Sequence, residues 1–181
     1  MANLLTGLRL LLVLPVALAF ADTEYISPLL LAVLMFSAIL SDYFDGKVAR
    51  LTNTASPRGQ IFDHATDCLF VSCALTGAAV AGMVSPVLPV LIVIAFTQYI
   101  LDSHYLYKEK QLHMSFLGRW NGVFYFVPLC LISASRLEFF SNIVPLLRVL
   151  VTVLGWTLVT STILSIADRA IAPLQIHRKT E

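Results

Sequence analysis

The sequence predicts an all-α, polytopic integral membrane protein with about six transmembrane helices. Of its 181 residues, 58% are hydrophobic and 13% are charged, which is about half the charged share of a typical soluble domain. The mean hydropathy is +0.83, and long apolar runs recur along the chain, so the composition excludes an ordinary water-soluble domain. The net charge is only +1. We therefore expect no nucleic-acid partner, because no overall basic surface is available.

About six apolar runs have a length suited to a hydrocarbon layer about 30 Å thick. We expect a helix in each, because a single segment in lipid must satisfy its own backbone hydrogen bonds. The second run is short, and its helix is expected to continue through Ala49 toward the membrane edge. Pro15 and Pro128 are each expected to kink a helix. In chain order, the expected spans are residues 4–20, 28–43, 61–83, 86–107, 120–137 and 145–166.

Basic residues gather in every second connection between these spans. The first connection is acidic and the third is uncharged, whereas the second, the fourth and the C-terminal segment are basic. The positive-inside rule then places both termini and the segment after the second span in the cytoplasm. We expect one domain over residues 1–181, integral to the cell (inner) membrane. The basic residues are Lys47, Arg50, Arg58, Lys108, Lys110, Arg119, Arg169, Arg178 and Lys179.

Four aspartates form two pairs on either side of the second connection. Asp42 and Asp45 are three residues apart, and Asp63 and Asp67 are four apart, so each pair lies on one face of its helix. A short connection makes the two helices antiparallel neighbours, and all four carboxylates could then converge. An isolated charge at this depth costs several kcal/mol, which favours a shared function over four separately solvated side chains.

Carboxylate oxygens suit hard ions such as Mg2+ or Mn2+ better than zinc. A site that holds two such ions close together commonly catalyses nucleophilic displacement at a phosphorus atom. A cation or proton transporter, with the carboxylates as its transport site, is a second class of function.

Three residues near the aspartates could receive a ligand. Gly46 and Gly59 leave room for a ligand or for a neighbouring helix. Arg50 is placed either to pair with a phosphate or to anchor the helix at the cytoplasmic face.

The whole pattern Asp42-x2-Asp45-Gly46-x2-Ala49-Arg50-x8-Gly59-x3-Asp63-x3-Asp67 resembles the signature of the CDP-alcohol phosphotransferase (CDP-alcohol phosphatidyltransferase) family. The opening Asn3-x2-Thr6-x2-Arg9 is similar to the start of the family's first helix, without the proline that often precedes it. The resemblance implies two divalent ions, Mg2+ or Mn2+, and a base that deprotonates the attacking hydroxyl. The implied metal ligands are Asp42, Asp45, Asp63 and Asp67, and Asp67 is also the implied base. The implied CDP-lipid contacts are Asn3, Thr6, Gly46, Ala49, Arg50, Ser56 and Gly59.

The resemblance further implies a membrane transferase of phospholipid biosynthesis. It would move a phosphatidyl group from CDP-diacylglycerol to a small hydroxyl acceptor and release CMP, at an active site facing the cytoplasm. A CDP-alcohol:diacylglycerol phosphotransferase is the alternative with the same chemistry, and family members resemble homodimers.

Several acceptor alcohols are compatible with the resemblance. The likeness extends to bacterial phosphatidylglycerophosphate and phosphatidylinositol-phosphate synthases, but the former typically carry Asp-Pro-x-x-Asp-Lys at the second pair. This chain has Asp63-His64-Ala65-Thr66-Asp67-Cys68, which weakens a glycerophosphate assignment. Three basic residues follow the fourth span: Lys108, Lys110 and Arg119. They either bind the phosphate of an acceptor or only set the orientation of the chain in the membrane.

Overall fold

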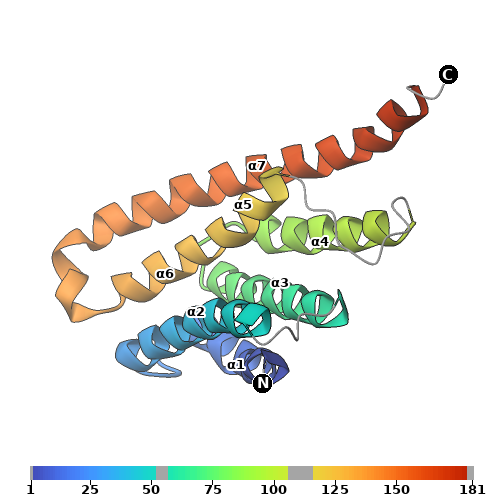
Figure 1. Ribbon diagram of the computed structural model, residues 1–181. Coiled ribbons are helices and arrows are strands. Elements are labelled where there is room, and N and C mark those ends of the chain that lie inside the picture. The colour runs from blue at the N-terminus through green and yellow to red at the C-terminus, as the bar shows by residue number, and fades with distance from the viewer. Residues whose placement is uncertain (1, 52–56, 106–115, 179–181) are drawn as a thin grey trace.

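In a computed structural model of the protein, the structure describes residues 2–51, 57–105 and 116–178. Side chains are described for residues 6–44, 59, 61–101 and 117–170. Within these ranges the chain is all-α, as the sequence predicts (Figure 1). The helices are α1 (Ala2–Ala21), α2 (Pro28–Leu51), α3 (Pro57–Val80), α4 (Val87–Tyr105), α5 (Phe116–Phe124), α6 (Phe126–Ser135) and α7 (Val144–Arg178), with a 3-10 helix, η1 (Glu138–Ile143), before α7. Helix α2 reaches Leu51, so the expected extension through Ala49 is confirmed.

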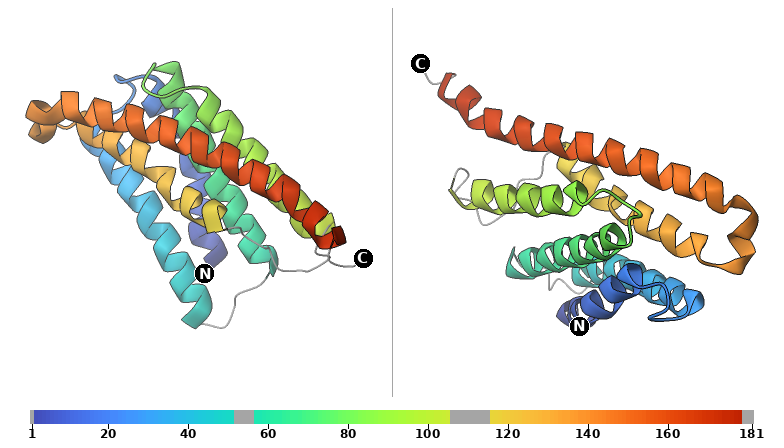
Figure 2. Two further views of the ribbon diagram at one scale, coloured as in Figure 1. Left: turned by 90° about the horizontal axis from the view of Figure 1, so that it is seen from above. Right: turned by 180° about the vertical axis from the view of Figure 1, so that it is seen from behind.

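The helices form two groups that share one bundle. Helix α1 packs mainly on α3 and α2, whereas the long helix α7 packs on α4, α5 and α6 (Figures 1 and 2). Contacts between α3 and α4 and between α2 and α6 join the groups. The start of α1, the end of α2, the start of α3 and the end of α7 lie at the same end of the bundle (Figure 1). The residues of the candidate site lie at this end.

The fifth rod of the bundle is broken into α5 and α6 at Tyr125. Pro128 is the cause, because proline has no N–H to donate to the carbonyl four residues earlier, and its ring crowds that carbonyl. The break is shallow: the backbone of Tyr125 stays helical, with φ −63° and ψ −24°, and its N–H still donates to Asn121 O at 2.9 Å. The division into α5 and α6 lies where a kink is expected from Pro128, whereas α1 runs through Pro15 as one helix.

Helices α1 and α3 approach each other very closely at Gly77. A Cβ atom placed there would overlap the carbonyl oxygen of Ala17 and lie 3.1 Å from the backbone nitrogen of Ala21. Phe20 of α1 and Phe70 of α3 are fully buried members of the hydrophobic core. Small residues at helix contacts let backbones approach in this way, and the result is a fixed register between α1 and α3.

Arg136, at the opposite end of the bundle, ties the last turn of α1 to the end of α6. Its guanidinium donates to the carbonyl oxygens of Ala19 at 2.5 Å and Phe20 at 3.1 Å. It also stands over the Phe20 ring, 5.6 Å from the centroid. The carbonyls at a helix end have no partner within the helix, so Arg136 supplies donors that lipid could not.

The outer surface of the bundle is strongly apolar. Leu11, Leu14, Phe36 and Trp156 are among the large side chains that are more than half exposed. Among the described residues, one helical stretch, Glu138–Ala170, is long and apolar enough to cross a membrane, and three shorter apolar stretches accompany it: Thr6–Ala21, Pro28–Phe44 and Val87–Leu101. An apolar exterior of this extent suits contact with lipid rather than water.

Candidate active site

Three carboxylates from two helices surround the guanidinium of Arg9. The Arg9 side chain is entirely buried. Its Nη2 lies 3.2 Å from Asp42 Oδ1 on α2, its Nη1 lies 3.3 Å from Asp63 Oδ1 on α3, and Nη1 also donates to Asp67 Oδ1. Helices α1, α2 and α3 therefore meet through this cluster of charged side chains.

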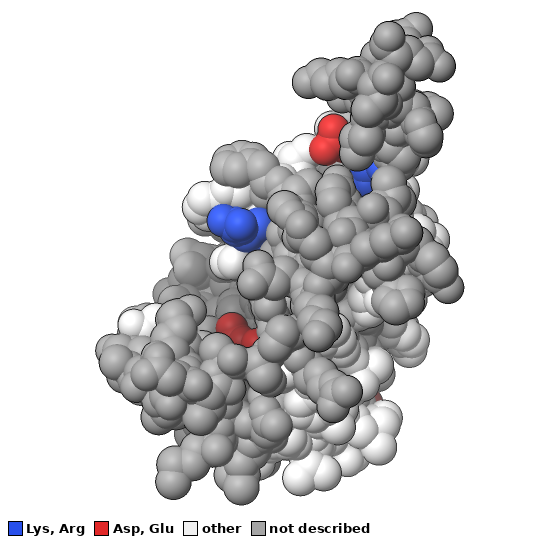
Figure 3. All heavy atoms as spheres, turned by 45° about the vertical axis from the view of Figure 1, so that its right-hand side comes forward, with Lys and Arg blue, Asp and Glu red and all other residues white. Residues whose placement is uncertain are grey.

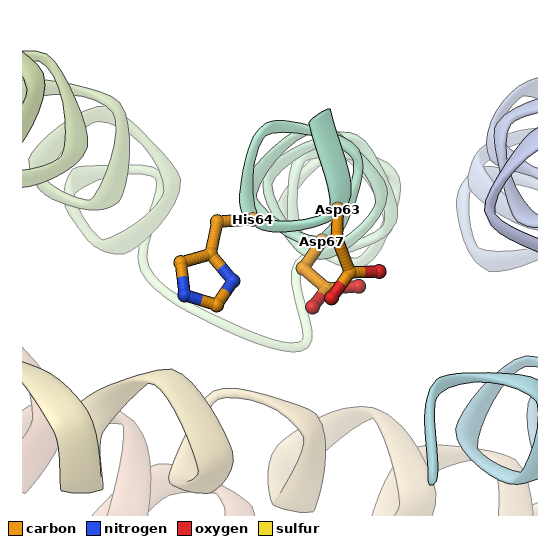
Figure 4. Close-up of side chains that lie close together, drawn as sticks. All are labelled: Asp63, His64 and Asp67. Carbon is orange, nitrogen blue, oxygen red and sulfur yellow. The ribbon is translucent and has the colours of Figure 1, made fainter. Parts of the chain in front are cut away.

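The spacing on α3 explains how this cluster forms. Asp63 and Asp67 lie one turn apart, so their carboxylates project from the same side of the helix. Figure 4 shows these two carboxylates next to each other, with the imidazole of His64 beside them. Ligand atoms of Asp63, His64 and Asp67 all lie within 4.8 Å of one another. Each of the three side chains is only partly buried, so solutes can reach them.

A cavity of about 550 Å³ opens beside the carboxylates. Asp42, Asp63 and Asp67 line it together with two arginines, Arg119 of α5 and Arg169 of α7. The rest of its wall is mostly apolar and aromatic, including Ile39, Val71, Ile92, Phe96, Tyr99 and Phe126. Figure 3, which turns this end of the bundle toward the viewer, shows red acidic atoms and blue basic atoms on the same face. The cavity thus offers acidic, basic and apolar surfaces to one ligand.

Polar contacts between helices hold the wall of the cavity that lies beyond the carboxylates. The Arg169 guanidinium stands over the Tyr99 ring at 5.0 Å, and Gln98 Nε2 donates to Ile166 O at 3.2 Å. Both contacts join α4 to α7. Helix α5 is joined to α7 by Ser161 Oγ, which donates to Asn121 Oδ1 at 2.7 Å. The hydroxyls of Tyr125 and Thr162 lie 2.7 Å apart. These bonds give the cavity a defined shape.

The sequence pattern of the CDP-alcohol phosphatidyltransferase family matches residues 1–164. The chain belongs to this family. Its members are membrane-bound transferases of phospholipid biosynthesis that depend on metal ions. The family assignment made from the aspartate signature is therefore confirmed.

Individual relatives match shorter stretches. Human cholinephosphotransferase 1 is 38% identical over 80 residues, which is 44% of this chain and 19% of that protein. The mouse protein of the same name is 38% identical over 79 residues, again 44% of this chain and 19% of that protein. A CDP-diacylglycerol–glycerol-3-phosphate 3-phosphatidyltransferase of Rickettsia felis is 33% identical over 73 residues, 40% of each chain. The matched stretch is thus about a fifth of the cholinephosphotransferases.

The side chains present fit the divalent ions on which the family depends. Partly buried carboxylates that converge from two helices, with an imidazole beside them, offer the hard oxygen donors that Mg2+ and Mn2+ prefer. Among the described side chains of this cluster, Arg9 offsets the negative charge only in part, because its single positive charge faces the three carboxylates of Asp42, Asp63 and Asp67. A further cation would relieve the repulsion that remains.

The structure describes only some of the residues that the sequence singled out. Asp42, Asp63 and Asp67 lie together, and Arg119 lines the cavity beside them. Thr6 is buried on α1, one turn before Arg9. Gly59 lies in the first turn of α3. The side chains that lie outside the described residues are those of Asn3, Asp45, Gly46, Ala49, Arg50, Ser56, Lys108 and Lys110.

Sequence reasoning missed two arginines of the site. The sequence pattern places Arg9 only in the helix opening and Arg169 only among the basic residues that set the topology. A signal for Arg9 was present, because a cation between apolar residues of a membrane helix needs an anionic partner. No comparable signal marks Arg169, which is far from the signature in sequence and reaches the cavity only through the packing of α7 on α4.

Proposed function

We propose that the protein is an integral-membrane phosphatidyltransferase that moves a phosphatidyl group from CDP-diacylglycerol to the hydroxyl of a small acceptor, releasing CMP. The observation that carries the proposal is the cavity, whose wall includes the signature carboxylates Asp42, Asp63 and Asp67 together with Arg119 and Arg169. Acidic residues suit a metal–diphosphate complex, and arginines suit an anionic group on the second substrate. Family membership supports the same chemistry.

In this proposal Asp42, Asp45, Asp63 and Asp67 hold two divalent ions, Mg2+ or Mn2+. Such ions supply charge stabilisation for the transferring phosphoryl group and the leaving phosphate. The chain itself contributes the convergence of carboxylates from α2 and α3, which orients the diphosphate in one direction. His64 lies close enough to Asp63 and Asp67 to take part in the same site.

The donor would enter from the membrane edge, with its acyl chains in lipid. By the family resemblance, Gly46, Ala49, Arg50 and Gly59 receive the nucleotide and Ser56 the diphosphate. Asn3 and Thr6 would cover the nucleotide from α1. Thr6 is buried one turn from Arg9, a position that keeps it near the same end of the bundle as the carboxylates.

Asp67 is the residue proposed to accept the proton of the attacking hydroxyl. The acceptor oxygen forms a bond to the lipid-side phosphorus while the bond from that phosphorus to the CMP oxygen breaks. The hydroxyl proton passes to the Asp67 carboxylate, and CMP leaves with the bonding electron pair. Asp67 lines the cavity that also holds Arg119 and Arg169, so an acceptor gripped by the arginines would present its hydroxyl toward this carboxylate.

Purified protein in detergent, given CDP-diacylglycerol and Mn2+, is expected to release CMP with at least one small alcohol. The panel should contain acceptors with and without a phosphate group, for instance glycerol 3-phosphate, inositol phosphate, inositol and serine. Because two arginines line the cavity, we expect the phosphorylated acceptors to give the faster release. CMP release with none of the panel would contradict the proposal.

Arg169 tests the acceptor side of the cavity. We expect Arg169→Met to raise the KM for the anionic acceptor at least about tenfold, since a charge-assisted hydrogen bond contributes about 1.5–3 kcal/mol. The KM for CDP-diacylglycerol should change little. Arg148→Met is the matched control, because Arg148 lies exposed on the same helix near its other end. An unchanged acceptor KM in the Arg169 variant would exclude this role.

A CDP-alcohol:diacylglycerol phosphotransferase is the second candidate. The 38% identity to human cholinephosphotransferase 1 over 80 residues favours it. Against it stand the two cavity arginines, which suit an anion better than a quaternary ammonium group. Supplying CDP-choline and diacylglycerol in the same assay separates the two, because only the second candidate would then release CMP.

Three further features remain predictions. We propose that residues 1–181 form one domain, that the site faces the cytoplasm at the inner leaflet of the cell membrane, and that the protein is a homodimer. The first two follow from the span pattern and the basic connections, and the third follows from the family resemblance.

A further inference from the structure

Arg9 is a cation that lies among the residues proposed to hold cations. It is carried by α1, which is otherwise almost entirely apolar, and its side chain is completely buried. Its two terminal nitrogens reach carboxylates on both α2 and α3: Nη2 lies 3.2 Å from Asp42 Oδ1, and Nη1 lies 3.3 Å from Asp63 Oδ1. The same Nη1 donates to Asp67.

The charges explain why such a residue matters. Three carboxylates held together in a medium of low dielectric repel one another strongly. A guanidinium in contact with all three offsets part of this repulsion and orients the oxygens by its fixed, planar array of donors. Without it, the repulsion would drive Asp42 away from Asp63 and Asp67 whenever no other cation was present.

The Arg9 guanidinium and a divalent ion would bind the same carboxylate oxygen atoms. Nη1 of Arg9 binds Oδ1 of both Asp63 and Asp67, and these residues are also proposed to bind metal. A Mg2+ ion requires its oxygen ligands at about 2.1 Å, so it must compete with the arginine for them. A positive charge that stays close by also repels an incoming ion.

We propose that Arg9 is a positioning residue with two linked effects: it holds the carboxylates of Asp42, Asp63 and Asp67 together before metal binds, and it weakens the binding of divalent ions. The proposal rests on the proposed function only in taking these aspartates as metal ligands. Its consequence is a site that stays assembled without metal and exchanges its ions readily.

A Mn2+ titration tests this proposal without reference to catalysis. Purified protein is stripped with EDTA, the chelator is removed, and free Mn2+ is followed by electron paramagnetic resonance. We expect Arg9→Met to lower the Mn2+ concentration at half-saturation at least about tenfold, because a positive charge close to the ion is lost. Arg9→Lys keeps the charge and is expected to stay within about threefold of the wild type.

The same variants should differ in metal-dependent stability. Without metal, Arg9→Met is expected to unfold at a lower temperature than the wild type, and Mn2+ should raise its unfolding temperature by more. Arg136→Met is the matched control, because Arg136 binds helix-end carbonyls and no carboxylate of this cluster. It should unfold earlier but leave the Mn2+ midpoint unchanged. Arg9→Gln, which also lacks the charge, replaces Arg9→Met if that variant does not fold.

The outcomes separate this proposal from the proposed function. A Mn2+ midpoint that is unchanged or higher in the uncharged Arg9 variants overturns the role of Arg9, while CMP release by the wild type leaves the enzymatic proposal intact. A wild-type protein that binds no Mn2+ overturns both. A lower midpoint in Arg9→Met, kept near the wild-type value in Arg9→Lys, supports the assignment.

Discussion

Asp67→Asn is expected to reduce CMP release from CDP-diacylglycerol about 1,000-fold. The substitution removes the proposed proton acceptor, and general bases contribute about 100- to 10,000-fold to rates. It also replaces a charged oxygen donor with a neutral amide in the proposed metal site. The shape of the residue is preserved, and Arg9 keeps Asp42 and Asp63 as partners, so the fold should survive.

The measurement is the initial rate of CMP release at saturating CDP-diacylglycerol, Mn2+ and the best acceptor of the panel. Asp168→Asn is the matched control, because Asp168 is exposed on α7 and does not line the cavity. It should retain nearly full activity. Elution as a single species in size-exclusion chromatography confirms that each variant is folded. An Asp67→Asn variant with wild-type rates would exclude Asp67 as the base.

Gly77→Ala is expected to destabilise the protein by about 3 kcal/mol or more, toward the upper end of the cost of overpacking. The new methyl group would overlap the carbonyl oxygen of Ala17. A backbone atom cannot rotate away as a side chain can, so α1 and α3 must separate. Since Arg9 on α1 contacts Asp63 and Asp67 on α3, the same separation should also lower CMP release.

Thermal unfolding in detergent, followed by circular dichroism, measures this effect. A loss of 3 kcal/mol corresponds to a decrease of about 6–12 °C for a chain of this size. Gly155→Ala in α7 is the control, because a Cβ atom there meets nothing within 4 Å. That change should leave stability unchanged or raise it slightly, since alanine favours helix. Equal unfolding temperatures for the two variants would show that α1 and α3 tolerate a wider spacing.

Local patterns in the sequence were sufficient for much of the architecture. Apolar run length predicted the helices, and the extension of α2 past the charged residues followed from the shortness of its run. The break at Tyr125 followed from Pro128, because the loss of one backbone donor acts within a single turn. The aspartate spacing likewise predicted that Asp63 and Asp67 share a face of α3.

Other features depended on contacts between residues far apart in the chain. The close approach at Gly77 involves α1 and α3, and glycine in a helix is compatible with many arrangements. The place of Arg169 in the cavity depends on how α7 packs on α4. Neither can be derived from spacing along one helix, because each is decided by side-chain volumes on two helices at once.

The sequence by itself determined the helices, the family and the shared face of Asp63 and Asp67, because each is encoded in short-range periodicity or in a motif of fixed spacing. Only the tertiary structure decided that Arg9 lies among Asp42, Asp63 and Asp67, and that Arg119 and Arg169 line the cavity beside them. The physical reason is that a charge in an apolar bundle takes its partner from whichever helix packing brings near. That choice depends on the register of whole helices against one another.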